Sequence, residues 1–71
     1  MLAVYAVKKG DNEITGERLD EKWYMTYKVA LEDYCKLIHK YSNGIEDVTV
    51  IVLDLDSEYV MAKVEILTEE A

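Results

Sequence analysis

The sequence predicts an α+β fold, namely a two-layer β-α-β-β sandwich in which one long helix packs on one face of a three-stranded sheet. Three observations support this prediction: β-favouring apolar runs near both ends, a long amphipathic segment between them, and turn residues at their boundaries. The chain has 71 residues, of which 51% are hydrophobic, and it contains no proline. We therefore expect a single domain over residues 1–71.

The first strand is expected at about residues 2–8, where the sequence reads LAVYAVK. A glycine, an aspartate and an asparagine at positions 10–12 follow this run, and they are a typical turn composition. The polar stretch over residues 9–19 is interpreted as a loop.

The helix is predicted at about residues 21–42. At 100° per residue, the apolar and aromatic side chains between positions 19 and 41 fall on one side of a helix, and most charges fall on the other. Asp20 is a suitable N-cap, and the Asn43–Gly44 pair is a suitable stop. Met25 and Val29 form an apolar pair on the polar side, which we interpret as ordinary surface residues.

A hairpin is predicted at about residues 47–67, with strands over 48–53 and 59–67 and a charged turn between them. Taking Asp56 and Ser57 as a two-residue loop fixes the cross-strand register. The residues that this register turns toward the helix are Ile51, Leu53, Val60, Ala62, Val64 and Ile66. The residues that it turns to the open face are Val48, Val50, Val52, Tyr59, Met61, Lys63 and Glu65. We favour the strand order first, third, second, which resembles half of a ferredoxin-like fold, over the sequential order.

One face of the predicted sheet has no cover, because a single helix covers only one side. Large exposed apolar patches are typical of association surfaces. We therefore expect another chain to cover the open face. In the alternative interpretation, the Lys and Glu side chains of that face screen a modest patch on a monomer.

The formal net charge of −7 is unevenly distributed. Residues 1–40 hold seven acids and seven bases, whereas residues 41–71 hold eight acids and one base. Acids are expected at the hairpin tip and at its base, where Glu46, Asp47, Glu69 and Glu70 gather. This balance argues against direct binding to nucleic acid or to an anionic membrane, and it favours a protein partner with a basic surface.

The function predicted from these features is non-enzymatic protein binding. The expected contact residues are Val50, Val52, Tyr59, Met61, Asp54, Asp56 and Glu58. In size and charge the chain is similar to small acidic inhibitors from phages and mobile elements, such as anti-CRISPR proteins and DNA mimics, although it carries no sequence motif of these families. The alternative is a homo-oligomeric structural or accessory protein that pairs through its open sheet face. An acidic surface that only improves solubility is a third interpretation.

No catalytic, cofactor or metal site is expected. Cys35 and His39 are four residues apart on the helix, but no oxyanion site accompanies them. One Cys and one His also give too few zinc ligands. Acids at positions 54, 56, 58 and 65 match a calcium loop in spacing, but Tyr59 replaces the glycine that its turn requires.

The remaining features concern the aromatic residues and the compartment. The helix aromatics could form a base-stacking platform, but their angles favour core packing instead. These residues are Trp23, Tyr24, Tyr27, Tyr34 and Tyr41. A lone cysteine excludes an intramolecular disulfide, and the basic pair follows the N-terminal apolar run rather than preceding it. We therefore expect a cytoplasmic protein.

Overall fold

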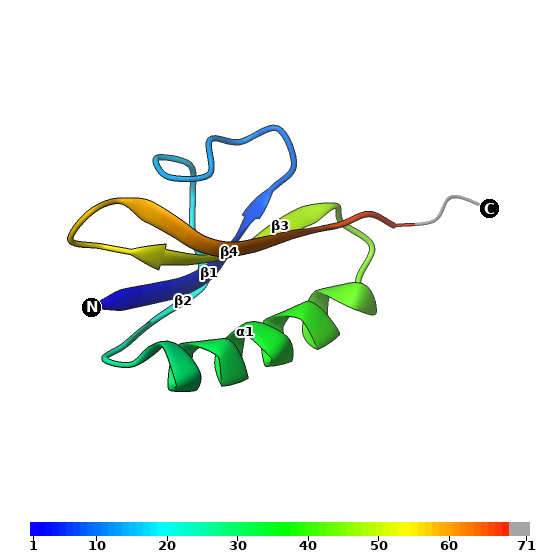
Figure 1. The fold of residues 1–71 in the computed structure, drawn as a ribbon. Coiled ribbons are helices and arrows are strands. Elements are labelled where there is room, and N and C mark those ends of the chain that lie inside the picture. Colours follow the sequence, from blue (N-terminus) through cyan, green and yellow to red (C-terminus); the bar gives the residue numbers. More distant parts are fainter. Residues whose placement is uncertain (69–71) are drawn as a thin grey trace.

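The computed structural model describes residues 1–68. It contains one helix and four strands in the order β1 (Leu2–Lys8), β2 (Leu19–Tyr24), α1 (Tyr27–Ser42), β3 (Val48–Asp54) and β4 (Tyr59–Ile66). Figure 1 shows α1 on one side of the sheet and the loop between β1 and β2 on the other. The α+β class and the packing of one helix on an antiparallel sheet are confirmed, but the sheet has four strands rather than three.

The strand missed by sequence analysis is β2, which occupies residues assigned partly to a loop and partly to the helix. Its sequence, LDEKWY, carries charges at three central positions. These charges are tolerated because β2 is an edge strand whose central side chains are exposed. Leu19 and Tyr24 alone turn inward and pack against the core. Their spacing also fits a helical stripe, which is why periodicity extended the predicted helix too far.

The helix begins at Tyr27 rather than near residue 21. Its N-cap is Thr26, whose hydroxyl oxygen accepts a hydrogen bond of 3.4 Å from the backbone N–H of Val29. Asp20 was therefore the wrong cap. The predicted end agrees with the structure, since the last helical residue is Ser42 and Asn43 caps the helix by donating from its backbone N–H to Tyr41.

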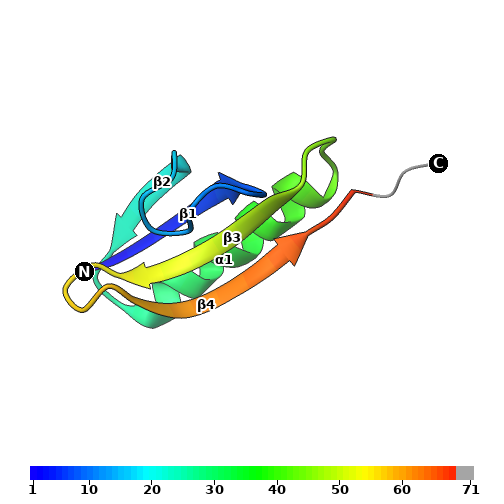
Figure 2. The same ribbon diagram turned by 90° about the horizontal axis from the view of Figure 1, so that it is seen from above.

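The sheet order is β2-β1-β3-β4, with each neighbouring pair antiparallel. In Figure 2, β2 and β4 form the two edges of the sheet. The predicted order was wrong, because β3 and not β4 lies beside β1. A continuous seven-residue ladder joins β1 and β3, from Leu2 opposite Asp54 to Lys8 opposite Val48.

The second hairpin differs from its predicted register. Leu53 lies opposite Val60 as expected, but Val52 lies opposite Ala62, which leaves Met61 as the extra residue of a β-bulge. Beyond the bulge the pairing is therefore shifted by one residue. The connection between the strands spans residues 55–58 and contains Glu58 at a φ of 56°.

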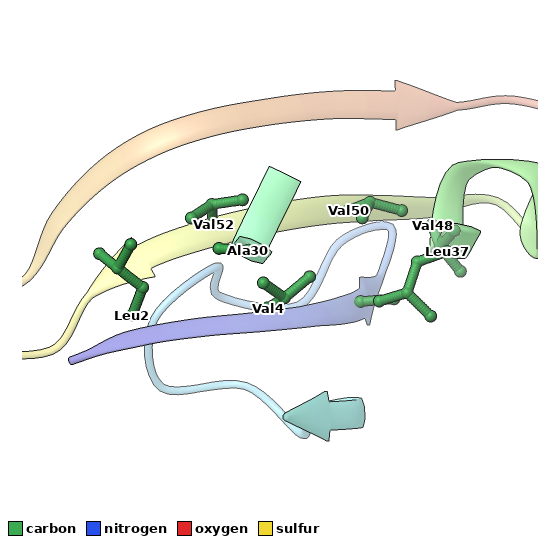
Figure 3. Packing of buried hydrophobic residues seen from close by; sticks show 8 residues of the cluster. Leu2, Val4, Ala30, Leu37, Val48, Val50 and Val52 are labelled. Atoms are coloured by element: carbon green, nitrogen blue, oxygen red, sulfur yellow. The ribbon is translucent and has the colours of Figure 1, made fainter. Parts of the chain in front are cut away.

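Two apolar clusters lie on opposite faces of the sheet. The cluster under α1 combines alternate residues of the central strands with helix residues, and Figure 3 shows several of these side chains, among them Val4, Val50 and Leu37. Its buried members are Leu2, Val4, Ala6, Ala30, Leu37, Val48, Val50 and Val52. The face assignment of β3 from sequence was therefore wrong, since Val50 and Val52 contact the helix side. The reason is that β3 is apolar on both faces, so its own composition does not distinguish them.

The opposite face is covered by the chain itself. Its buried cluster consists of Ala3, Tyr5, Val7, Ile51 and Leu53. Ile14, from the loop over residues 9–18, packs against this cluster together with Leu55 and Val60. Tyr5 is fully buried although no helix lies over it. The expected open apolar face is thus absent from the part of the chain that the structure describes.

Candidate interaction surface

The cover loop, residues 9–18, is held by hydrogen bonds within the loop and to the sheet. The side-chain oxygen of Asn12 accepts from the backbone N–H groups of Ile14 and Thr15, at 2.8 and 2.9 Å. The hydroxyl group of Tyr5 donates to the carbonyl oxygen of Glu13 at 2.7 Å, and burial raises the pKa of this phenol. Lys63 on β4 pairs with the Glu13 carboxylate at 3.1 Å. The loop is therefore fixed to the sheet by polar as well as apolar contacts.

Arg18 ends this loop in a small cluster beside β2. Its guanidinium lies 4.5 Å from the centre of the Tyr5 ring and donates to Glu21 at 2.8 Å. Trp23 also donates to Glu21, at 3.0 Å. Burial acts to raise the pKa of Glu21, but the hydrogen bonds from Trp23 and Arg18 outweigh it and lower the pKa. These contacts link the end of the cover loop to side chains of β1 and β2, so the cluster has a structural role.

We define the acidic tip as Asp54, Asp56, Glu58, Tyr59 and Met61, around the turn of the second hairpin. Asp56 and Glu58 are exposed, and Asp54 is half-buried. Tyr59 is 65% exposed and Met61 is 40% exposed. The Asp54 carboxylate accepts a 3.0 Å hydrogen bond from the backbone N–H of Asp56, which shapes the turn.

Five of the seven contact residues predicted from sequence lie at the acidic tip. The other two, Val50 and Val52, have no exposed surface because α1 covers them. Their assignment to an open face is corrected, and they are excluded from any contact surface of the folded chain.

The described acids differ in whether a Lys or Arg side chain pairs with them. In the first part of the chain, Asp20 pairs with Lys40 at 2.8 Å, and the carboxylates of Glu13 and Glu21 also have basic partners. Among residues 1–68, no Lys or Arg side chain pairs with an acid of the tip. The amino group of Met1 lies 3.3 Å from the 85% exposed Asp56 side chain, where water screens the pair.

A shallow depression at the opposite end of the sheet was missed by sequence analysis. It is lined by Lys8, Lys9, Ile45, Glu46, Asp47 and Thr68. Thr68 donates to the Asp47 carboxylate from its backbone N–H at 2.7 Å and from its hydroxyl group at 2.8 Å. The backbone bond and then the hydroxyl bond lower the pKa of Asp47. This carboxylate therefore ties the end of β4 to the start of β3. Glu69 and Glu70, which were expected nearby, lie outside the described residues.

The other candidate sites receive no geometric support. Cys35 and His39 are both exposed, and over the described range no hydrogen bond links them. Within residues 1–68, no three metal-ligating side chains gather at one place, and this includes the acids with calcium-loop spacing. No helix in this range is long and apolar enough to cross a membrane.

The aromatic residues separate into two groups. Tyr24, Tyr34 and Tyr41 are half-buried and pack against the cluster under α1, as core packing predicts. Trp23 lies on β2 instead of the helix and is 60% exposed. Met25 and Val29 are also exposed, at 78% and 44%, near the start of α1. A continuous base-stacking platform is not formed by these side chains.

The chain matches no protein-family model, no curated protein and no solved structure.

Proposed function

We propose that this chain is a non-enzymatic binding module whose acidic tip contacts a basic surface of a partner protein. The observation that carries the proposal is the combination, at the tip, of exposed Tyr59 and Met61 with acids that no Lys or Arg side chain among residues 1–68 pairs with. Aromatic residues and Met are enriched in the centres of protein interfaces, and complementary charge accelerates encounter. The acids of the tip would steer the partner, and Tyr59 would be buried on contact.

The class of partner follows from the charge of the module. A basic protein surface that accepts acids and an aromatic ring is common on proteins that bind nucleic acid. The module would act by occupying that surface, as inhibitors of the anti-CRISPR or DNA-mimic type do. We place this interaction in the cytoplasm.

The experiment uses a photo-crosslinking amino acid at position 59 in host cells. We expect a covalent adduct with one cytoplasmic protein, and we expect excess double-stranded DNA in the lysate to reduce the adduct. The matched control carries the crosslinker in place of Tyr27, another exposed tyrosine, which lies at the start of α1. Equal adducts at both positions, or none at position 59, would contradict the proposal.

A charge variant tests the role of the acids. Replacing Asp56 and Glu58 by Asn and Gln should weaken adduct formation at position 59 and reduce its sensitivity to salt. Replacing Glu17 and Glu32, which are also exposed, by Gln removes the same charge elsewhere and should leave the adduct unchanged. If both pairs of substitutions weaken the adduct equally, adduct formation depends only on the total charge of the chain, and the tip is not the contact.

The second candidate function is a homo-oligomer that pairs through an open sheet face. It was suggested by the expected exposed apolar face, which the described structure does not have. That face is buried beneath the cover loop in the single chain.

A further inference from the structure

The outer edge of β4 is the longer of the two sheet edges. β4 spans eight residues, Tyr59–Ile66, and in the described structure only β3 pairs with it. The bulge at Met61 lies near the start of β4, and beyond it β4 pairs with β3 without interruption from Ala62 to Ile66. The opposite edge strand, β2, is interrupted near its centre by a bulge and by Asp20, which has a φ of 56°. A regular edge strand exposes a row of backbone N–H and C=O groups to which another strand can bind. Figure 2 shows β4 along the border of the molecule.

The sequence of this edge is complementary to itself when read in the opposite direction. Residues 61–67 read MAKVEIL, with Val64 at the centre. Two antiparallel copies related by a two-fold axis through Val64 place residues equally distant from it opposite each other. Lys63 then faces Glu65 of the second copy, and this charge pair occurs twice.

The apolar positions are complementary in the same register. On the helix side, Ala62 faces Ile66 of the second copy, and Val64 faces its own counterpart. All three of these side chains are half-buried in the single chain, so pairing would complete their burial. At the ends of the paired segment, the bulged Met61 lies opposite Leu67, which follows the last residue of β4, and these side chains are 40% and 56% exposed.

Neighbouring registers lack this complementarity. Side chains directly opposite each other in an antiparallel pair share one face, so the two-fold axis must pass through a residue. An axis through Lys63 or through Glu65 places like charges opposite each other, which is destabilising. An axis through Ala62 places Lys63 opposite Met61 and Glu65 opposite Tyr59, which are uncharged. An axis through Ile66 places Glu65 opposite Leu67 and Lys63 opposite a position beyond the end of β4.

We propose that β4 pairs with β4 of a second copy, antiparallel and centred on Val64, so that two four-stranded sheets join into one. Glu65 has no ion-pair partner among residues 1–68, and Lys63 would supply one from the second copy. Lys63 keeps its bond to Glu13, since its ammonium group has three donors. The two Tyr59 residues would lie about 33 Å apart along the strands at ~3.3 Å per residue, so net repulsion between the tips is screened at physiological salt.

The first test is the mass of the full chain in solution by light scattering and sedimentation equilibrium. We expect a dimer at micromolar concentration. The Glu65→Lys variant places two Lys residues opposite each other and should be a folded monomer, as judged by circular dichroism. Glu32→Lys makes the same charge change on the exposed side of α1 and should remain dimeric. A monomeric wild type, or a dimeric Glu65→Lys variant, would overturn the proposal.

The second test determines the register. The substitution Val64→Cys, made together with Cys35→Ser, brings two thiols together at the axis, where opposite Cα atoms are about 4.5–5.5 Å apart. This spacing allows a disulfide. Ala62→Cys in the same background separates the thiols by about 13 Å, four residues at ~3.3 Å each. Mild oxidation should crosslink the first variant and not the second; the reverse result would place the axis elsewhere. Neither test involves the partner of the acidic tip.

Discussion

The hydroxyl group of Tyr41 donates a 2.5 Å hydrogen bond to the carboxylate of Asp20, and this bond joins the last turn of α1 to the bulged edge strand β2. Lys40 donates to the same oxygen at 2.8 Å. The bond from Lys40 and then the bond from Tyr41 lower the pKa of Asp20. Burial and then the Asp20 carboxylate raise the pKa of Tyr41 to about 12.

This pair predicts a specific loss of stability in alkali. Folding raises the pKa of Tyr41 from 10.0 to about 12. The protonated Tyr41 hydroxyl group therefore contributes fully to the free energy of unfolding below pH 10.0, and this contribution is lost as the pH rises through about 12. Tyr41→Phe should cost about 1 kcal/mol at neutral pH. The difference in unfolding free energy between wild type and variant should then shrink in alkali, as measured by urea unfolding. Tyr59→Phe, at an exposed hydroxyl group, is the matched control and should show no such convergence.

Asp33 is a buried acid whose substitution should stabilise the fold. The residue is 8% exposed, and among residues 1–68 its Oδ2 atom has no hydrogen-bond partner. A buried unsatisfied polar atom costs about 1–3 kcal/mol, and a charge costs more than a neutral amide. We expect Asp33→Asn to raise the free energy of unfolding by about 1 kcal/mol at neutral pH. The exposed neighbour substitution Glu32→Gln should change it by less than about 0.5 kcal/mol. A destabilised Asp33→Asn variant would contradict this account.

Gly16 should be required for closure of the cover loop. A Cβ atom at this position would lie 2.5 Å from the backbone oxygen of Asn12, which accepts a 2.8 Å hydrogen bond from the N–H of Gly16. Gly16→Ala must therefore displace the backbone, and overpacking of this kind costs about 1–3 kcal/mol. At Gly44 the nearest atom would be 3.3 Å away, so Gly44→Ala is a matched control with a smaller effect. Thermal unfolding of both variants measures the difference.

Thr26 should contribute more to helix stability than its exposed position suggests. Thr26→Ala removes the acceptor for the Val29 N–H, and such a loss at an N-cap costs about 1 kcal/mol. Thr26→Ser keeps the hydroxyl group and should retain most of the stability. Chemical unfolding can distinguish the two variants. If Ala and Ser were equivalent at this position, the cap would have no energetic role.

The strands that could be predicted from the sequence are the three that supply most of the buried and partly buried apolar residues. β1 spans the residues of the predicted first strand, and β3 and β4 lie within the predicted hairpin. These strands are rich in residues that favour β-structure, and turn residues follow or separate them. The end of the helix was also found, because an Asn and a Gly follow it.

The failures have a common physical origin in elements that depend on distant contacts. β2 is polar and forms a strand because it pairs with β1. This pairing cannot be inferred from the β-propensity of its own residues. The bulge at Met61 and the burial of Tyr5 depend on how the loop and sheet fit together. The exposure of Tyr59 and of the acids at the tip could be predicted because a turn exposes its residues wherever it lies, whereas the burial of Val50 and Val52 depends on the correct face of β3.

The position of β1 between β2 and β3 has a consequence for folding during synthesis. The ladder that joins Leu2 to Asp54 closes only after β3 has been made. At about 5–20 residues per second, the ribosome needs several seconds to make the intervening segment. During that interval the nascent chain holds an apolar strand without its central neighbour. Aggregation and chaperone contact should therefore concentrate on β1 before β3 emerges.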